Sequence, residues 1–466
     1  MVTIYFDKQV FSHLFQAKEE KYSILLEKIL SHKRDFIFLY SDAHLFDLQR
    51  DVTDIKYDEM DFMQSIVDGN HMIYESSNLQ VVKESPRAVF DNMVKMDDIF
   101  SSENIDVTQI TQEQCDVINN SIDLLLKDLS GQLEPDWLKQ RIPISSVDLQ
   151  MDKETLTSCI KFVFNEFYKK KELYKEVRDI AINNYNPEQI TADGENIFNN
   201  QLVSSPLGLS FTETIKATLK QLGLTSCNAA IVYYISYMLL DLLGVCKEAR
   251  KKVRFYNMQV DCCHSFFGSY CDCFVSDDVG VLEKSKTLYK LFNIKTQIYS
   301  IDDFIEKFDE AINNHKKSVF ECFDEICIDY RRRKVAKIET ISKYTVTHLC
   351  TSHEYFGYFN YMLERKSEDE TILMLHKNNN VNQPILIQEI EIIVNRLVCL
   401  FNSDNIGIVY DLFDKDIEIP RFETDNWCRS FLLNIAEVGL TKFKQSSMLC
   451  LWIKFKQPII PIGGIK

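Results

Sequence analysis

The sequence predicts an α/β fold with a central parallel sheet, split by a long helical insertion. Short apolar runs alternate with helical spacing at the start of the chain, and the same alternation resumes near residue 250. Between them, apolar residues follow mainly helical periodicity. We therefore expect one α/β domain formed by residues 1–54 and 251–310, a mainly helical insertion at 55–250, and a separate C-terminal α+β domain at 311–466.

The start of the chain alternates strand and helix. Val2–Phe6 is a run of β-branched and aromatic residues, and helical spacing follows it. Asp35–Tyr40 is a second apolar run, after which Ser41 and Asp42 mark the start of a helix at Ala43–Arg50. Because β-α-β-α order favours parallel pairing, we expect these two strands to lie side by side and parallel.

The later elements are predicted from the same periodicities. In the second part of the α/β domain we expect helices at Gln259–Tyr270, Val281–Phe292 and Ile301–Phe308, and strands at Cys273–Val275 and Lys295–Tyr299. In the insertion we expect helices at Thr111–Leu129, Lys153–Asn183, Phe211–Leu222 and Asn228–Val245. In the C-terminal domain we expect strands at Thr371–Leu375, Gly407–Tyr410 and Leu449–Phe455, and helices at Gln388–Phe401 and Trp427–Glu437.

Composition narrows the class of protein. The net charge of −16 disfavours general adhesion to nucleic acid or to anionic membranes. Fourteen cysteines and the lack of signal-peptide features at the start predict a reducing cytoplasm. The apolar stretch Ala229–Val245 is shorter than the ~20 residues that a spanning helix needs. It also contains Asp241, so we expect a buried helix and no membrane association.

Acidic residues stand at or near the ends of the predicted strands. Asp7 follows the first strand, Asp47 lies on the helix after the second, and Asp261 lies on the helix before the third. Asp278 follows the third strand, with Asp277 beside it. Because sites in parallel sheets form at the carboxyl ends of strands, these acids are expected to converge. Clustered carboxylates repel one another but suit a hard divalent cation.

The order of these pieces resembles the PIN-like nuclease domain, a metal-dependent nuclease fold with a parallel sheet between helical layers. The resemblance covers roughly residues 1–50 and 255–308. It is carried by Asp7, by Ser41 with Asp47-Leu48, by Asn257 with Asp261 and His264, by Ser276 with Asp278, and by the closing Asp303-Phe304. Two features depart from the family pattern: Asp47 stands where Glu is usual, and the whole insertion separates Asp47 from Asp261.

The resemblance implies a nuclease that depends on Mg²⁺ or Mn²⁺. Asp7, Asp47, Asp261 and Asp278 would be the catalytic acids and would hold one or two ions, with Asp277 as a further ligand. Residues expected to support them are Ser41, Asn257, His264 and Ser276. RNA is favoured over DNA as the substrate, and an endoribonuclease of this build suits RNA processing, a toxin role or antiviral defence.

Basic residues matter because the substrate would be a polyanion. Arg250, Lys251, Lys252 and Arg254 stand just before Asp261, and we expect them to contact phosphates. A second basic run, Arg331-Arg332-Arg333-Lys334, is a weaker candidate, since charge runs are usually solvated surfaces.

Each candidate also has an ordinary interpretation. Asp7 and Asp42 stand where helix caps or first-turn acids are common. Asp277 and Asp278 suit a turn, and a histidine such as His264 is more often a structural hydrogen-bonding group than a base. The cysteines near this element, Cys262, Cys263, Cys271 and Cys273, lack the paired C-x₂-C spacing of zinc modules and are expected to be core residues.

Two other functions stay open at this level. The chain could be a non-catalytic scaffold built on a nuclease-like domain, with the insertion or the C-terminal domain binding a protein partner. Retention of acids at all four positions disfavours this alternative. The other alternative is a structure-specific DNA nuclease, because related folds cut flaps and branches.

Overall fold

The computed structural model describes most of the chain outside the middle of the insertion. The described residues are 2–75, 78–93, 171–188, 200, 202–221, 229–246, 253–341, 343–378, 386–403, 407–408, 427–433, 436–443 and 448–455.

A six-stranded sheet organises the first part of the protein, in the order β4-β3-β2-β1-β5-β6. Its strands are β1 (Thr3–Phe6), β2 (Ile37–Ser41), β3 (Asn70–Glu75), β4 (Asn78–Lys83), β5 (Cys273–Val275) and β6 (Gln297–Tyr299). All neighbours pair in parallel except β3 and β4. Because β1 lies between β2 and β5, the sheet joins the two segments that the insertion separates, which confirms the predicted α/β fold.

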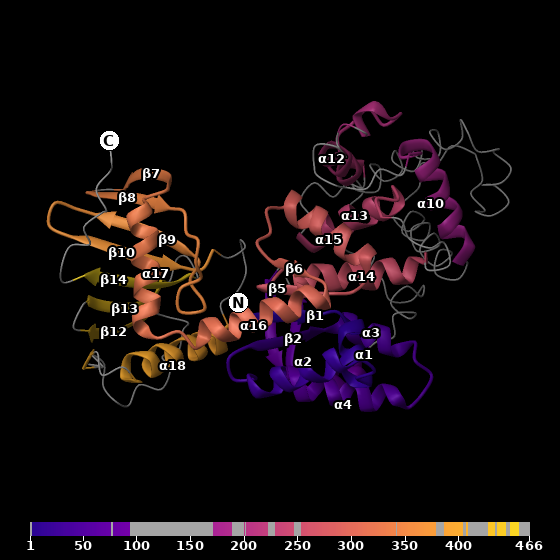
Figure 1. Ribbon diagram of the computed structural model, residues 1–466. Helices are drawn as coiled ribbons and strands as arrows, with labels where there is room; N and C mark the ends of the chain where they lie inside the picture. Colours follow the sequence, from indigo (N-terminus) through magenta and orange to yellow (C-terminus); the bar gives the residue numbers. More distant parts are fainter. Residues whose placement is uncertain are drawn as a thin grey trace.

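Helices cover both faces of this sheet. The helices on and around it are α1 (Lys8–Gln16), α2 (Glu20–Ser31), α3 (Asp42–Gln49), α4 (Ile55–Val67), α5 (Pro86–Asn92), α14 (Phe255–Gly268), α15 (Val279–Leu291) and α16 (Ile301–His315). Phe6 and Phe38 pack in one core with α1, α2, α4 and α16. Tyr5 and Phe274 pack in another core with α14 and α15. Since neighbouring strand residues point to opposite faces, the unit has three layers (Figure 1).

The sheet extends further along the chain than the sequence predicts. β3 and β4 fall within residues 55–250, where we expect mainly helices, and they continue the sheet past residue 54. The run His71–Tyr74 is short enough to fit either a strand or a buried helix. Parallel pairing of Tyr40 with His71 shows that it forms a strand. Asp261 also lies in the middle of α14, not at its start.

Besides α4 and α5, the helices described within residues 55–250 include α10 (Lys171–Tyr185), α12 (Phe211–Gln221) and α13 (Ala229–Leu242). These last three match three predicted helices, although the predicted helix at 153–183 is described only from residue 171. The predicted helix at 111–129 lies outside the described residues. Among the helices described, none is both long and apolar enough to span a membrane.

The C-terminal part is an eight-stranded antiparallel sheet, in the order β11-β12-β13-β14-β10-β9-β8-β7. Its strands are β7 (Val335–Ile341), β8 (Tyr344–Leu349), β9 (Tyr361–Lys366), β10 (Thr371–His376), β11 (Gly407–Ile408), β12 (Trp427–Leu433), β13 (Ala436–Phe443) and β14 (Met448–Phe455). Helix α17 (Val319–Arg332) crosses one face of this sheet, and α18 (Ile387–Ser403) lies at its lower end in Figure 1.

The strands predicted at 371–375 and 449–455 and the helix predicted at 388–401 are confirmed in type. Of the strand predicted at 407–410, residues 407–408 are described and form a strand, and the rest lies outside the described residues. The helix predicted at 427–437 is wrong, because this stretch forms β12 and the start of β13. Its apolar run Phe431-Leu432-Leu433 fits both periodicities. Pairing of β12 with β11 and β13 decides the conformation, since β-propensity depends on packing against neighbouring strands.

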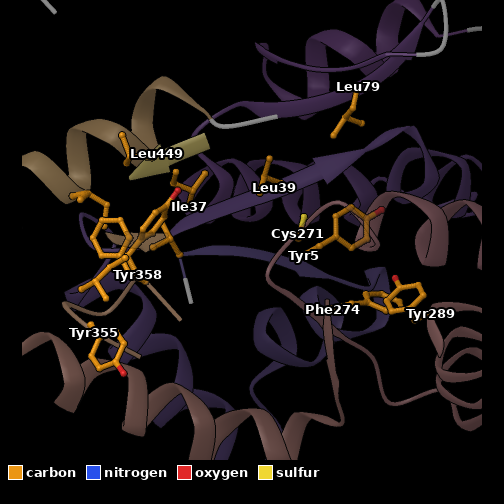
Figure 2. Close-up of a cluster of buried hydrophobic side chains, with 14 of the residues drawn as sticks. Tyr5, Ile37, Leu39, Leu79, Cys271, Phe274, Tyr289, Tyr355, Tyr358 and Leu449 are labelled. Atoms are coloured by element: carbon orange, nitrogen blue, oxygen red, sulfur yellow. The ribbon is translucent and has the colours of Figure 1, made fainter. Parts of the chain in front are cut away.

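One hydrophobic core connects the two sheets. Figure 2 shows members of this core from both parts, among them Ile37 of β2 and Tyr355 and Tyr358 from the C-terminal part. A buried ion pair adds to the junction, because Lys377 Nζ lies 2.5 Å from Asp272 Oδ1. Asp272 also accepts a 2.6 Å hydrogen bond from the backbone N–H of Val2. The C-terminal part is thereby joined to the start of β1.

Candidate functional site

Asp7 joins the carboxyl ends of β1 and β5. Its backbone N–H donates to the carbonyl of Val275 over 2.9 Å. Oδ1 accepts from the N–H of Gln9 (3.1 Å), which caps α1, and Oδ2 accepts from the Ser276 hydroxyl (2.6 Å). The residue is only 6% exposed. Asp7 is therefore both the helix cap of the ordinary interpretation and a fixed carboxylate at the sheet edge.

The carboxylates of Asp277 and Asp278 accept hydrogen bonds at the starts of two different helices. Asp278 Oδ1 accepts from the N–H of Gly280 over 2.8 Å and caps α15, while its own N–H donates to the Ser276 hydroxyl. Asp277 Oδ1 instead accepts from the N–H of Ile301 over 2.9 Å, at the start of α16. The charge of Asp278, and not that of Asp277, is among those that raise the pKa of Asp261, so Asp278 is the better ligand candidate.

Asp47 is brought to the site by packing between helices far apart in sequence. α3 packs on α14 through Ala43 and Val260. Asp47 Oδ2 lies 3.4 Å from Nε2 of His264, whose side chain is 1% exposed, whereas the Asp47 side chain is 32% exposed. The insertion therefore does not separate Asp47 from the second segment in space.

A buried polar chain continues from His264 into the sheet. His264 Nδ1 lies 3.0 Å from the Tyr5 hydroxyl, which lies 2.6 Å from the Ser41 hydroxyl. Burial and the neighbouring His264 lower the pKa of His44 well below its usual range, and His44 Nε2 lies 2.7 Å from the carbonyl of Phe6. Burial also raises the pKa of the Tyr5 hydroxyl well above its usual range. These groups stay neutral and hold Asp47 through His264.

The pKa of the Asp261 carboxyl reflects its burial and the charges around it. Burial raises the pKa of its carboxyl well above the usual range, and the nearby Lys284 opposes that shift. The negative charges of Asp278, Asp7 and Asp47 raise the pKa further. Three acids from other elements therefore act on the Asp261 carboxyl.

Lys284 is a buried cation that the sequence analysis did not single out. It is 1% exposed, and its Nζ lies 2.8 Å from Asp241 Oδ1 on α13. Tyr174 donates to Asp241 Oδ2 over 2.6 Å, and Arg178 donates to the Asp241 carbonyl over 2.8 Å. The available signal was its position three residues after Val281, on the apolar face of a helix. Lys284 links the insertion to the acidic site.

Other predicted residues have structural partners. Asn257 Oδ1 accepts from Arg50 Nη1 over 2.8 Å. The Arg50 guanidinium lies over the Tyr256 ring, 4.7 Å from its centroid. Asp42 is the first residue of α3, which agrees with its interpretation as a first-turn acid. Its Oδ1 lies 2.8 Å from His71 Nε2.

The basic cluster is described only in part. Arg250, Lys251 and Lys252 lie outside the described residues, and Arg254 is half-buried at the N-cap of α14. In the second basic run, Arg333 pairs with Glu364 at 3.0 Å in the C-terminal part. Arg50 is the exposed cation that the structure places at the contact between α3 and α14.

The cysteines behave as core residues. Burial raises the pKa of the Cys262 and Cys271 thiols well above the usual range, and raises that of Cys263 to about 12. Zinc binds thiolates, so raised pKa values oppose a zinc site here.

The four acids Asp7, Asp47, Asp261 and Asp278 are candidate ligands for a divalent cation. Across the part of the chain that the structure describes, no group of three or more His, Cys, Asp or Glu side chains is arranged to hold a metal ion. Mg²⁺ usually binds one or two carboxylates and keeps several waters, so a closed cage is not required. The all-oxygen donors and the mutual repulsion felt by Asp261 fit such an ion.

Comparison of the chain with models of protein families, with curated proteins and with solved structures gives no match. What the site can do is therefore inferred from its own residues.

Proposed function

We propose that this protein is a metal-dependent nuclease that hydrolyses phosphodiester bonds, with RNA favoured over DNA. One observation carries the proposal: Ser276 holds Asp7 and Asp278 together at the ends of β1 and β5, and the charges of Asp7, Asp47 and Asp278 raise the pKa of Asp261. The cation that acts on it, Lys284, is already paired with Asp241. Negative charge gathered at the carboxyl edge of a parallel sheet favours binding of a divalent cation.

The chain's own residues would position such an ion and the substrate. A bound Mg²⁺ or Mn²⁺ supplies Lewis-acid stabilisation of the charge that develops on the phosphate oxygens. Asp7 and Asp278 are held by helix-cap hydrogen bonds and by Ser276 between them. His264 orients Asp47. Asp261 would have to be ionised to serve as a ligand, because ligand carboxylates bind metals in their charged form.

The substrate must approach against a net charge of −16. Local cations such as Arg50 and Arg254 would contact phosphates beside the acids. The insertion and the C-terminal sheet would add substrate contacts or bind a protein partner. We also propose that the protein acts in the reducing cytoplasm, in RNA processing or as a toxin or antiviral effector.

The decisive experiment is cleavage of single-stranded RNA by the purified chain with Mg²⁺, with Mn²⁺ and with a chelator. We expect cleavage only with a divalent ion, and a loss of at least about 100-fold in Asp7→Asn and in Asp278→Asn. Asp277→Asn is the matched control, because an amide oxygen can still accept from Ile301 and the side chain faces α16. Unchanged cleavage in both Asp7→Asn and Asp278→Asn would overturn the proposal.

One observation favours a second candidate, a non-catalytic scaffold: the described side chains form no closed group of metal ligands. Calorimetric titration with Mn²⁺ separates the two. Heat of binding together with a raised melting temperature supports the nuclease, and neither effect supports the scaffold. If cleavage is found, comparing single-stranded RNA with flapped DNA distinguishes a ribonuclease from a structure-specific DNA nuclease.

A further inference from the structure

Strand β7 forms one edge of the antiparallel sheet and is open to solvent (Figure 1). Along its sequence VAKIETI every residue is exposed except Glu339, which is half-buried. Three apolar side chains are among those exposed: Val335 at 43%, Ile338 at 62% and Ile341 at 55%. In the described part of the chain, β8 is the one strand that pairs with β7.

An edge of this kind invites pairing with another strand. Its outer row of backbone N–H and C=O groups has no ladder partner among the described strands, and these groups form hydrogen bonds readily with an added strand. Proteins usually protect long edges with proline, with short strands or with several charges. β7 is seven residues long and has no proline; its charged residues are Lys337 and Glu339, and its pairing with β8 shifts register between Val335 and Lys337. The stretch after this shift pairs regularly and keeps its outer edge available.

We propose that β7 pairs with β7 of a second copy of this chain, antiparallel and centred on Ile338. The pairing uses the regular stretch of β7 that follows the register shift between Val335 and Lys337. In this register Lys337 lies opposite Glu339 of the other copy, and Ile338 lies opposite Ile338. The two exposed Ile338 side chains then face one another across the two-fold axis. Cross-strand apolar pairs of this type stabilise antiparallel sheets.

The charges select the same register. Lys337 Nζ already contacts Glu339 Oε2 at 2.5 Å within one chain, and His348 Nε2 lies 2.9 Å from Glu339 Oε1. Pairing centred on Ile338 places Lys337 of each copy opposite Glu339 of the other, so opposite charges alternate around the axis. Like charges placed directly opposite destabilise a sheet.

Neighbouring registers are less favourable. The two sheets keep the same faces only when the axis passes through a residue, because side chains alternate with a period of two. An axis through Lys337 sets lysine opposite lysine, and an axis through Glu339 sets glutamate opposite glutamate. The β7 sequence is thus complementary to itself about Ile338.

The predicted dimer is reversible. A single pair of strands buries less than the ~1,200–2,000 Å² of a stable interface. We therefore expect the apparent mass in analytical ultracentrifugation to rise toward that of a dimer as the full chain is concentrated through the micromolar range. This inference is independent of the proposed nuclease activity.

Ile338→Lys tests the interface, because it sets two lysines against each other at the axis on an exposed position. We expect this variant to stay monomeric at every concentration. Phe320→Lys is the matched control: Phe320 is also exposed, at 56%, but lies on α17. A wild-type chain that stays monomeric, or a dimer that survives Ile338→Lys, would overturn the proposal.

Register is tested by cysteine cross-linking under mild oxidation. Cα atoms of directly opposed residues lie roughly 4.5–5.5 Å apart, within reach of a disulfide. Ile338→Cys should form a cross-linked dimer absent from the wild type, whereas Thr340→Cys alone should not, since residue 340 does not lie opposite residue 340 of the other copy. Lys337→Glu should abolish the dimer and Lys337→Glu with Glu339→Lys should restore it. Equal cross-linking at both positions would contradict the register.

Discussion

The Ser276 hydroxyl donates a 2.6 Å hydrogen bond to Asp7 Oδ2, joining residues 269 positions apart. The same hydroxyl accepts from the N–H of Asp278 over 3.1 Å. One small side chain therefore holds an acid at the end of β1 and another beyond the end of β5. This contact fixes the Asp7 carboxylate relative to the backbone of Asp278, so we expect it to affect both stability and metal binding.

Ser276→Ala is expected to lower both the stability of the fold and its affinity for a divalent cation. Removing the donor leaves the buried Asp7 carboxylate short of one hydrogen bond, which costs about 1–3 kcal/mol of unfolding free energy. Mn²⁺ affinity should fall by roughly 10-fold or more, as for other residues that orient ligands. Urea unfolding and calorimetric titration measure the two effects. Ser300→Ala, which removes an exposed helix cap of α16, should leave Mn²⁺ affinity unchanged.

Lys284→Met is expected to destabilise the fold strongly. It leaves the buried Asp241 carboxylate with Arg178 and Tyr174 only, and loss of one partner from a buried ion pair costs about 3–5 kcal/mol. Lys290→Met on the same helix is the control, because Lys290 is exposed. Urea midpoints compare the two variants. Similar midpoints would show that Lys284 contributes no more than a surface lysine.

Metal binding should strengthen as pH rises. Burial and neighbouring acids raise the pKa of Asp261, so its carboxyl holds a proton at pH values where a free aspartate is ionised. A bound divalent cation displaces that proton. We expect Mn²⁺ affinity to increase from about pH 5 to about pH 8. Proton release, measured by calorimetry in buffers of different ionisation enthalpy, should shrink in Asp261→Asn. Equal release in both proteins would contradict this assignment.

Acid should loosen the contact between α16 and α18. Burial and the nearby Arg396 guanidinium lower the pKa of His315 from 6.5 to about 2. Arg396 Nη2 lies 3.0 Å from His315 Nδ1. Between these two pKa values the unfolded chain binds a proton that the folded chain does not, so stability falls as pH falls below about 6.5. His315→Gln stays neutral, and its melting temperature should depend less on pH across this window. An unchanged slope would exclude His315 as the cause.

Much of the fold follows from local pattern. The apolar runs at β1, β2 and β5 predict buried strands, and the helical spacing between them predicts parallel pairing, which the sheet order confirms. Pattern failed at β3 and β12, where short apolar runs fit a strand and a helix equally well. There the conformation depends on pairing with neighbouring strands, and those neighbours are far away or ambiguous in sequence.

The sequence by itself determined which acids the protein carries and on which kinds of element, because hydrophobic periodicity places Asp7 and Asp278 after strands and Asp47 and Asp261 on helices. Tertiary structure alone decided which of these carboxylates share one field. Packing of α3 on α14 brings Asp47 toward Asp261 despite the insertion, and Asp277 accepts a hydrogen bond from Ile301 at the start of α16. Tertiary structure also placed Lys284 close enough to act on the Asp261 carboxyl. Electrostatic coupling depends on distance and burial, and neither is encoded in the spacing of residues along the chain.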